Sequence, residues 1–418
     1  MKILMLRPSY YPQISGGTHL AMDLVEDLIK DGHQIKLIVP MPTRMEQTII
    51  DEYKNKKIEE LYDGNLEIVR LTNRFSEKNI VSRALRMLNT AFKMFKCIIK
   101  EKDIDVIFSH SMPIFLGPLS VIGGKLKKKP VIYWEQDIVS ESIISTNIAG
   151  KGFKRKILYG YARRLEKKTS KKCTHIITIS NKFKQRQLEL KKPEDKVDVV
   201  YNWIDTDEVY PIERNDNYLF DEFNLDRTKF YVTYCGNLGI PQNVEILIDA
   251  AKSLKEIKDL QFVIFGNGVR KKKIEEYLKN SGTDNCILLP LQPIEETKFV
   301  YSLGDVGVVI GRKGTSNNGF PSKTWSILAA GQAMISCFDI ESELSNFVKE
   351  GKCGITVEPD SANELKNAVL NMYENRKKTK QYGINARKYV IDNFSRKIAT
   401  KKIIEIINNV KEEYNERK

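Results

Sequence analysis

The sequence predicts an α/β protein with two doubly wound parallel-sheet domains, on the basis of three observations. With 418 residues, the chain is too long for one hydrophobic core and suits two domains of about 200 residues each. Its apolar content of 41% and charged content of 29% are those of a folded, soluble chain. Short apolar runs alternate with helical patterns throughout, which predicts parallel sheets covered on both faces.

The first series of predicted strands occupies the N-terminal half. Its members are the runs Lys2–Leu6, Gln34–Val39, Leu66–Leu71, Asp105–Ser109, Val131–Trp134 and His175–Ile179. Helical patterns separate them, among them His19–Lys30 and Phe153–Lys172. After the first strand, Gly16 and Gly17 favour a tight turn whose backbone can approach an anionic group, although a plain turn explains the pair equally well.

A second series of strands follows a turn-rich segment at residues 202–207. Its members are Tyr231–Cys235, Phe262–Phe265, Ile287–Leu289, Val306–Ile310, Met334–Ser336 and Gly354–Val357. The chain then ends in helical patterns with an interruption around Asn393–Ser395. We therefore expect domains at 1–203 and 204–390, and a C-terminal helix at 391–418 that crosses back to the first domain.

The most informative segment lies between the strands Val306–Ile310 and Met334–Ser336. It contains Phe320, Pro321, Ser322 and Lys323 in a polar loop that begins a helix. In open parallel sheets, ligands bind outside the carboxyl ends of the strands. The start of a helix there directs free N–H groups and partial positive charge at the ligand, and Lys323 adds a full charge. The segment therefore predicts a phosphate site.

Two further loops with glycine follow strands of the second series. They are Gly236-Asn237-Leu238-Gly239 and Gly266-Asn267-Gly268. Together with the Gly16-Gly17 pair, they are expected at the strand ends where a ligand binds. The chain contains neither GxGxxG nor a P-loop, so a dinucleotide-binding or NTPase interpretation loses its main support.

The net charge of +14 comes entirely from the first half of the chain. Residues 1–200 hold 37 Lys and Arg against 23 Asp and Glu, whereas residues 201–418 hold 31 of each. Residues 151–192 alone hold 15 basic residues against Glu166 and Glu189. Such one-sided charge indicates an anionic partner, either nucleic acid or a membrane surface rich in acidic lipid.

A basic amphipathic segment, Val81–Lys100, helps to choose between these partners. Its apolar residues recur at helical spacing and are Leu85, Leu88, Phe92, Phe95 and Ile99. Such a helix can lie in a headgroup layer, although a helix that packs against the core has the same periodicity. No nucleic-acid recognition motif accompanies the charge, so we do not expect a nucleic-acid partner.

The cysteine pattern and the hydropathy of the chain predict a cytoplasmic protein. Six cysteines, at 97, 173, 235, 286, 337 and 353, form no CxxC pair and no metal-ligand spacing, which favours a reduced compartment. We expect neither a structural metal nor a disulfide framework. No run approaches the roughly 20 apolar residues that span a bilayer. The apolar start, Met1–Leu6, is too short for a signal peptide.

Taken in order, these motifs resemble glycosyltransferase family 4, whose GT-B fold has two Rossmann-like domains facing across a cleft. The resemblance covers essentially the whole chain. It is carried by Gly16-Gly17, Asp105–His110, Ile176–Ser180, Val199–Asp205, Tyr234–Gly239, Phe265–Gly268 and the Pro321-Ser322-Lys323 helix. Trp134–Ile138 followed by Glu141-Ser142 further resembles the branch that builds O-antigen, capsule and exopolysaccharide, which includes acetamido-deoxyhexose transferases.

The resemblance implies a hexosyltransferase that takes a sugar-nucleotide donor in the C-terminal domain and an acceptor in the N-terminal one. Developing charge on the departing nucleoside diphosphate must be stabilised by preorganised donors. Residues near Ser322, the Lys323 ammonium and the Gly16-Gly17 turn can supply them, so we expect no metal and no cofactor. Asp137 and His110 are expected to face the acceptor or the transferred sugar, although an ordinary hydrogen-bonded histidine would also explain His110.

This chain departs from the family pattern at the donor site. Two glutamates that usually contact the donor sugar and its ribose are replaced by Asn318 and Ser326. The Arg and Lys that usually hold the donor phosphates are replaced by Asn237 and Gln242. We therefore predict His110, Asp137 and Asn318 at the reacting centre. The predicted donor set is Gly16, Gly17, Gly236, Asn237, Gln242, Gly266, Asn267, Gly268, Phe320, Pro321, Ser322, Lys323 and Ser326.

For the acceptor, the basic half and the resemblance together indicate a polyprenyl-diphosphate-linked saccharide at the inner face of the cell membrane. The donor is expected to carry a hexose or an N-acetylated hexosamine, with or without further deoxygenation, on UDP. Residues expected to face the membrane are Arg83, Arg86, Lys93, Lys96, Lys154, Arg155, Lys156, Arg163 and Arg164. Two alternatives remain, a sugar-nucleotide epimerase of the same fold and a non-catalytic binder of anions or nucleotide-sugars.

Overall fold

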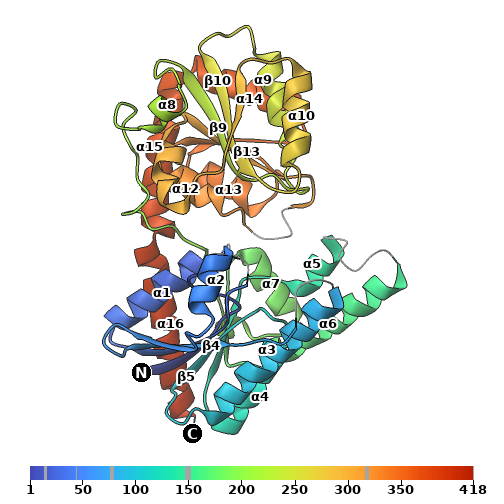
Figure 1. Ribbon diagram of the computed structural model, residues 1–418, viewed down its shortest axis with the longest axis vertical. Helices are drawn as coiled ribbons and strands as arrows, with labels where there is room; N and C mark the ends of the chain where they lie inside the picture. Colours follow the sequence, from blue (N-terminus) through green and yellow to red (C-terminus); the bar gives the residue numbers. More distant parts are fainter. Residues whose placement is uncertain (14–16, 44, 76–79, 146–151, 316–319, 418) are drawn as a thin grey trace. The chain divides into compact units, whose positions relative to one another are not determined.

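The computed structural model describes residues 1–418 except 14–16, 44, 76–79, 146–151, 316–319 and 418 (Figure 1). The chain divides into two compact units, residues 1–202 with 399–418, and residues 203–398. Each unit contains its own sheet, and the two sheets are almost entirely parallel. The predicted fold class is therefore confirmed.

The first unit contains an eight-stranded sheet in the order β3-β4-β2-β1-β5-β6-β7-β8. Its strands are β1 (Lys2–Leu6), β2 (Gln34–Pro40), β3 (Ile58–Leu61), β4 (Leu66–Leu71), β5 (Val106–His110), β6 (Val131–Glu135), β7 (His175–Thr178) and β8 (Val197–Val199). All neighbours pair in parallel except β3 and β4. The central strands β1, β5 and β6 are almost completely buried, as expected for near-continuous apolar runs between two helical layers.

Helices cover both faces of this sheet. They are α1 (Thr18–Lys30), α2 (Gln47–Tyr53), α3 (Ile80–Lys100), α4 (Leu116–Lys127), α5 (Val139–Ser145), α6 (Phe153–Lys172), α7 (Asn181–Glu189), the short 3₁₀ turn η1 (Glu194–Lys196) and α16 (Arg396–Glu416). Figure 1 shows α1 and α16 on one face and α3, α4 and α6 on the other. Lys411 of α16 pairs with Asp105 at 2.8 Å, which ties the end of the chain to the start of β5.

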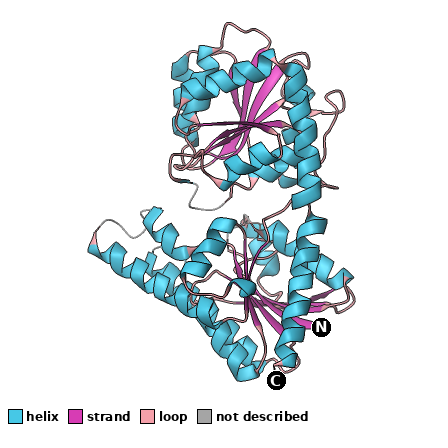
Figure 2. Cartoon of the chain, turned by 180° about the vertical axis from the view of Figure 1, so that it is seen from behind, coloured by secondary structure: helices cyan, strands magenta, loops and turns pink. Residues whose placement is uncertain are grey.

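The second unit contains a six-stranded parallel sheet in the order β11-β10-β9-β12-β13-β14. In Figure 2 the strands of each unit are magenta and lie among cyan helices. Its strands are β9 (Phe230–Asn237), β10 (Leu260–Asn267), β11 (Cys286–Leu289), β12 (Val306–Ile310), β13 (Ala333–Cys337) and β14 (Gly354–Val357). Its helices are α8 (Leu219–Glu222), α9 (Glu245–Ser253), α10 (Lys271–Ser281), η2 (Ile294–Glu296), α11 (Thr297–Ser302), α12 (Lys323–Ala329), α13 (Glu343–Glu350), α14 (Ala362–Glu374) and α15 (Arg376–Phe394).

Both sheets reverse their strand order at one point. In the first sheet the reversal lies between β1 and β5, and in the second it lies between β9 and β12. Connections leave to opposite faces at such a point, so the loops diverge and leave a crevice at the carboxyl ends of the strands. The residues that follow β1, β5, β9 and β12 are therefore the first place to look for a ligand site in each unit.

Candidate active site

In the second unit, the reversal point is occupied by Lys323, the first residue of α12. Its Nζ atom lies 3.7 Å from the centroid of the Tyr234 ring on β9. Lys323 as a whole residue is half-buried, whereas its Nζ atom is buried and has no hydrogen-bond partner among the described residues. A cation over an aromatic face is stabilised by the ring, but its N–H groups stay unsatisfied. Lys323 therefore has unused capacity to bind an anion.

Burial lowers the pKa of the Lys323 ammonium to about 7, and the neighbouring Cys235 thiol opposes that shift. The low dielectric around the amine disfavours its charged form, and the described residues supply no carboxylate to compensate. The amine is consequently divided between its neutral and charged forms near neutral pH. An anion at Nζ would restore the charge, because an opposite charge at short range favours protonation.

The two glycine loops of the second unit lie side by side at the ends of β9 and β10. Gly236 is in register with Gly266, and Leu238 N–H donates to the Asn267 carbonyl at 2.8 Å. Gly236 has φ +138°, and a Cβ atom there would lie 3.0 Å from Lys323 Nζ. These two loops therefore converge as predicted, and the missing Cβ atom at Gly236 leaves room for the Lys323 amine at the strand end.

Asn237 and Gln242 stand where the family usually has basic residues, and they flank Gly239. A Cβ atom on Gly239 would lie 2.8 Å from Asn237 Nδ2 and 2.8 Å from Gln242 Oε1. Gln242 Oε1 is buried and lacks a hydrogen-bond partner within the described part of the chain. The loop thus offers amide groups at the positions of the missing cations, and Lys323 is the nearby positive charge.

Some of the other residues of the predicted donor segment pack against the core, and others are exposed to solvent. Phe320 stacks on Trp325 with ring centroids 4.8 Å apart, which anchors the loop to α12. Ser322 is exposed, whereas Pro321 and Ser326 are half-buried. Since α12 has only seven residues, its dipole is small and the Lys323 side chain is the main anion-binding group. Asn318 lies outside the described residues.

In the first unit, the reversal point is occupied by Arg7, a residue that the sequence patterns did not single out. Arg7 directly follows β1 and is 2% exposed. Its Nη2 donates to the Gly17 carbonyl at 3.0 Å, and its guanidinium lies 4.8 Å from the Trp134 ring centroid. Nε and Nη1 are buried and have no hydrogen-bond partner among the residues described. Gly16 falls outside those residues.

His110 and Asp137 lie at the carboxyl ends of the next two strands of the same sheet, as predicted. His110 ends β5, and its Nδ1 accepts a hydrogen bond from Met112 N–H at 2.9 Å. Burial, together with the charge of Arg7, lowers the pKa of His110 well below its ordinary value. The neutral ring must then carry its proton on Nε2. His110 can therefore donate a hydrogen bond to a substrate oxygen.

Asp137 lies two residues beyond β6, and its backbone N–H donates to the Ser111 hydroxyl at 3.1 Å. Burial raises the pKa of the Asp137 carboxyl, while the positive charge of Arg7 acts in the opposite direction. A carboxylate at a strand end can accept hydrogen bonds from sugar hydroxyls or take a proton from one of them. Arg7, His110 and Asp137 thus lie at the carboxyl ends of three adjacent strands of one sheet.

A buried polar network joins the carboxyl end of β6 to the helices that pack beside it. Gln187 of α7 donates to Glu135, the last residue of β6, at 2.6 Å. Arg186 of α7 pairs with Glu166 of α6 at 2.8 Å, and Glu166 also accepts from Ser140 at the start of α5. The network joins β6 to three helices and thereby fixes the backbone from which Asp137 projects.

The basic residues predicted to face a membrane lie on α3 and α6. In α3 the residues that face the core are Ala91, Met94 and Ile98, whereas much of the predicted apolar stripe is exposed. The exposed large apolar side chains of α3, α4 and α6 are Val81, Leu85, Met87, Phe92, Ile99, Ile122, Leu126, Phe153, Ile157, Leu158 and Tyr161. This set of exposed apolar side chains is called the helical face below.

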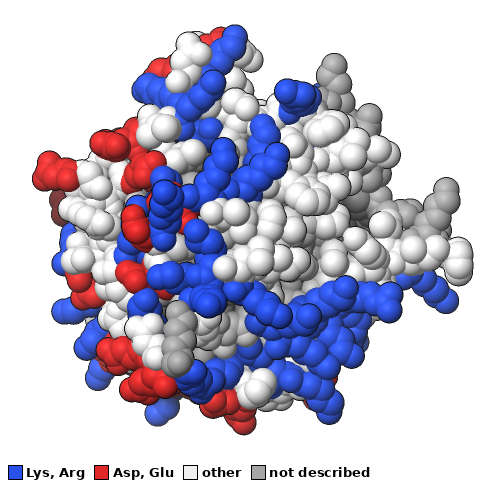
Figure 3. Space-filling model, turned by 90° about the horizontal axis from the view of Figure 1, so that it is seen from below, with Lys and Arg blue, Asp and Glu red and all other residues white. Residues whose placement is uncertain are grey.

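Basic side chains border this helical face. Figure 3 shows Lys and Arg gathered beside uncharged surface on the side of the molecule seen from below. Arg83, Lys96, Lys156 and Arg164 are exposed. Arg86 and Lys93 donate to backbone carbonyls of Phe75 and Thr72, and Arg163 donates to the Tyr159 hydroxyl at 2.8 Å. Arg155 is half-buried, and the side chain of Lys154 is outside the described part.

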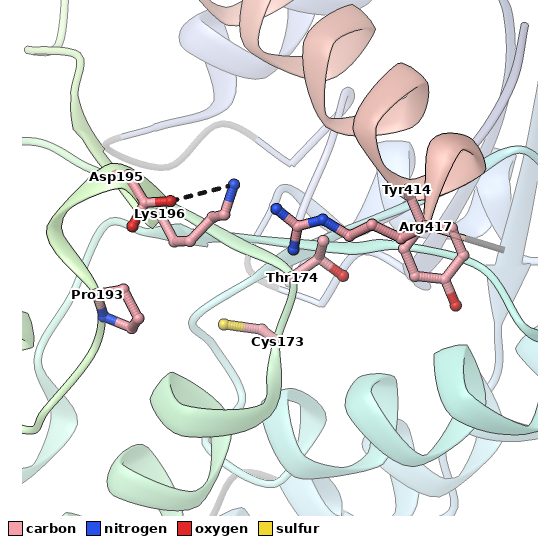
Figure 4. Close-up of a pocket in the computed structure, with 7 residues that line it drawn as sticks. All are labelled: Cys173, Thr174, Pro193, Asp195, Lys196, Tyr414 and Arg417. Carbon is pink, nitrogen blue, oxygen red and sulfur yellow. Dashed lines mark ion pairs between the residues drawn. The ribbon is translucent and has the colours of Figure 1, made fainter.

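A cavity of about 530 Å³ lies in the first unit, next to the amino ends of β7 and β8 (Figure 4). Cys173 and Thr174 precede β7, and Lys196 precedes β8, so the cavity adjoins the amino ends of the strands. Lys196 pairs with Glu413 at 2.6 Å, and Arg417 approaches the same carboxylate at 3.5 Å. Because its cations are already paired and it lies away from the carboxyl ends, this cavity is separate from the candidate site.

In the described part of the chain, no helix combines the length and the apolar composition needed to cross a bilayer. No group of three His, Cys, Asp or Glu side chains in that part is arranged to hold a metal ion.

Comparison with known proteins agrees with this geometry. The model for "Glycosyltransferase Family 4" matches residues 14–208, and the model for "Glycosyl transferases group 1" matches residues 216–389. The putative colanic acid biosynthesis glycosyl transferase WcaI of Escherichia coli K12 is 24% identical over 370 residues, which cover 87% of this chain and 90% of that protein. The probable glycosyltransferase WbjE of Pseudomonas aeruginosa is 23% identical over 292 residues, or 69% of this chain and 71% of that one.

Among solved structures, HepE of Anabaena in complex with UDP and glucose has a TM-score of 0.71 at 16% identity, covering 98% of this chain and 100% of that one. The two-sheet fold, the site and these matches define a glycosyltransferase of the GT-B class. The chain belongs to glycosyltransferase family 4.

Proposed function

We propose that this glycosyltransferase moves a hexose or an N-acetylated hexosamine, with or without further deoxygenation, from a UDP-sugar to a lipid-linked saccharide in the synthesis of a bacterial surface polysaccharide. Two relatives support the biological setting, since one is named for colanic acid synthesis and another is a poly(ribitol-phosphate) α-N-acetylglucosaminyltransferase of Staphylococcus aureus. The fold neighbour HepE was solved with UDP-glucose, which supports the choice of nucleotide.

The unpartnered Nζ of Lys323 is the observation that carries the proposal. When the glycosidic bond to the diphosphate breaks, negative charge builds up on the departing oxygen. A buried amine that becomes protonated beside the diphosphate stabilises that charge, and a low-dielectric site strengthens the interaction. Because Lys323 supplies this charge, we propose that transfer requires no metal ion.

The assay that tests this function uses the full chain with a panel of UDP- and GDP-sugars and a polyprenyl-diphosphate-linked saccharide, with and without EDTA. We expect transfer of one sugar to the lipid, with UDP released in equal amount and no loss of rate in EDTA. If the donor sugar is epimerised instead, the protein is a sugar-nucleotide epimerase. If the donor binds but is not converted, the protein is a non-catalytic binder. Inhibition by EDTA would remove the metal-free part of the proposal.

We further propose that the helical face lies on the inner surface of the membrane, where the lipid-linked acceptor is located. Exposed apolar side chains such as Phe92 and Leu126 can enter the acyl boundary. Each Lys or Arg near an acidic surface contributes roughly 1 kcal/mol, so a few of those bordering the face suffice for reversible binding. Sedimentation with vesicles tests this: binding should require acidic lipid and weaken with salt, and indifference to both would contradict it.

A further inference from the structure

Arg7 has no part in the transfer proposed above, yet it lies at the reversal point of the first sheet. We propose that the carboxyl end of β1 is an anion-binding subsite in which Arg7 binds a phosphoryl oxygen of a diphosphate-bearing substrate. This inference rests on the proposed function only for the identity of that substrate.

The position of the guanidinium is tightly defined. Nη2 is held by the Gly17 carbonyl at 3.0 Å, and the Trp134 ring lies 4.8 Å from the centre of the group. These two contacts use one nitrogen and one face. The N–H groups on Nε and Nη1 are left without a hydrogen-bond partner in the described part of the protein, although both nitrogens are buried. A preorganised donor of this kind is characteristic of a binding site.

The charge of Arg7 is also uncompensated. Burial lowers the pKa of Arg7 to about 10, so the group remains charged at neutral pH. Asp137 is the nearby acidic residue, but within the described ranges no ion pair joins its carboxylate to Arg7. His110 is neutral and cannot balance the charge. A buried charge without a partner is costly, and an anionic ligand offsets this cost.

Another buried arginine of the same sheet, Arg70, has the carboxylate partner that a buried arginine with a structural role needs. Arg70 on β4 is 3% exposed, its Nη1 contacts Glu59 at 2.6 Å, and its Nη2 donates to the Tyr11 carbonyl at 3.0 Å. Arg70 thus has a carboxylate partner that Arg7 lacks. The contrast indicates that burial alone does not explain the unpaired state of Arg7.

A phosphoryl group suits this subsite for two reasons. Guanidinium N–H groups form strong, charge-assisted hydrogen bonds to phosphate oxygens, and several such oxygens are available around one phosphorus atom. Lys323 has the equivalent place in the second sheet, so among the described residues each unit has a buried cation with unused N–H groups at its reversal point. The diphosphate bound by Arg7 can belong either to the nucleotide or to the lipid-linked acceptor.

The first test measures binding of inorganic diphosphate by calorimetry to the full chain and to the variants Arg7→Gln, Lys323→Gln and the double variant. In Lys323→Gln the remaining binding should be that of the Arg7 subsite, and adding Arg7→Gln should weaken it at least tenfold. Arg70→Lys is the matched control and should leave binding unchanged. Unchanged binding after folded Arg7→Gln would overturn the proposal.

If Arg7→Gln does not fold, Arg7→Met provides the same test, because an apolar chain of similar length removes the charge and can still pack on Trp134. Unchanged diphosphate binding in Arg7→Met overturns the proposal equally.

Steady-state kinetics then identify the source of the diphosphate. A rise of KM confined to the lipid-linked acceptor assigns the subsite to the acceptor, and a rise confined to the UDP-sugar assigns it to the donor. Unchanged KM for both substrates would overturn a role in substrate binding. If no sugar is transferred at all, the proposed function fails, whereas the diphosphate titration still decides whether Arg7 forms an anion site.

Discussion

Lys323 Nζ lies 3.7 Å from the centroid of the Tyr234 ring, so the amine is stabilised by an aromatic face rather than by a carboxylate. The Tyr234 hydroxyl donates to the Asn237 carbonyl at 2.9 Å, which fixes the ring at the end of β9. A carboxylate partner would compete with a diphosphate for the ammonium group, and a ring does not. This pair keeps a cation at the end of β9 without neutralising it, as the proposed donor site requires.

Replacing Lys323 by Met should separate stability from activity. Removal of an uncompensated buried charge is expected to raise the free energy of unfolding at pH 6 by roughly 1–3 kcal/mol. The same change should lower kcat/KM by about 100-fold, because a donor to the leaving group is lost. Lys298→Met is the control, since Lys298 lies over the Tyr210 ring in the same unit and has no role in the site. A variant with normal kcat/KM would exclude the assigned role.

The pH dependence of donor binding follows from the pKa of Lys323. In the free protein this pKa is lowered to about 7, below its value of 10.5 in an unfolded chain. The cost of burying the charged form is therefore fully present below pH 7 and is relieved as the pH rises from about 7 to 10.5. A diphosphate raises the pKa again, so binding of UDP at pH 8 should take up protons. Calorimetry in buffers of different ionisation enthalpy measures this uptake, which should vanish in Lys323→Met.

Gly236→Ala should damage the donor loop in two ways. The backbone has φ +138°, a conformation that costs an alanine about 1–3 kcal/mol, and the new methyl group would contact Lys323 Nζ. We expect a lower melting temperature and a weaker affinity for UDP. Gly282→Ala is matched for positive φ, at +65°, but a Cβ atom there has nothing within 4 Å. It should lose stability without losing affinity, and equal effects of the two variants on UDP binding would contradict the assignment.

The raised pKa of Glu135 predicts that the stability of the protein also depends on pH. Burial raises the pKa of this carboxyl from 4.5 to about 8, although Gln187 and Arg186 oppose the shift. The folded chain therefore binds more protons than the unfolded chain between about pH 4.5 and 8, so this group lowers stability as the pH rises through that range. Glu135→Gln should flatten the decline, as measured by urea unfolding at several pH values. An unaltered profile would mean that Glu135 is ionised in the folded protein.

Apolar contacts of the helical face should matter for vesicle binding as much as charge does. Phe92 is 48% exposed and Leu126 is 64% exposed, on neighbouring helices. Burial of a large apolar side chain contributes about 1.5–3 kcal/mol, so Phe92→Ser with Leu126→Ser should weaken binding to acidic vesicles at least roughly tenfold. Val269→Ser is the control, since Val269 is 86% exposed in the second unit. Equal loss in the control would show that the effect is not specific to this face.

Much of the framework was predictable from the sequence because buried parallel strands are short, apolar and separated by helical patterns. Helix α6 has the predicted bounds, and the break near residue 394 lies where α15 ends and α16 begins. Strand β3 was missed, since Ile58–Leu61 contains two glutamates and is an edge strand. Strand β8 has three residues, too few for a pattern to emerge.

The candidate site was predictable only in part. Lys323 and the glycine loops were found because turn residues after a strand have local signatures. Arg7 was not found, because nothing in its neighbours along the chain distinguishes it from an ordinary exposed arginine. Its importance depends on contacts with Gly17 and Trp134, which only the folded sheet brings together. The exposure of the α3 stripe was likewise undecidable from periodicity, because a core face and a docking face have the same spacing.

The first unit is discontinuous, since it takes its last helix from residues 399–418. During synthesis, the second unit can be complete while the first still lacks Lys411 and Glu413, the partners of Asp105 and Lys196. Folding of the first unit can thus be completed only after the whole second unit has left the ribosome. A nascent chain cannot complete the first sheet layer before the second unit has been made.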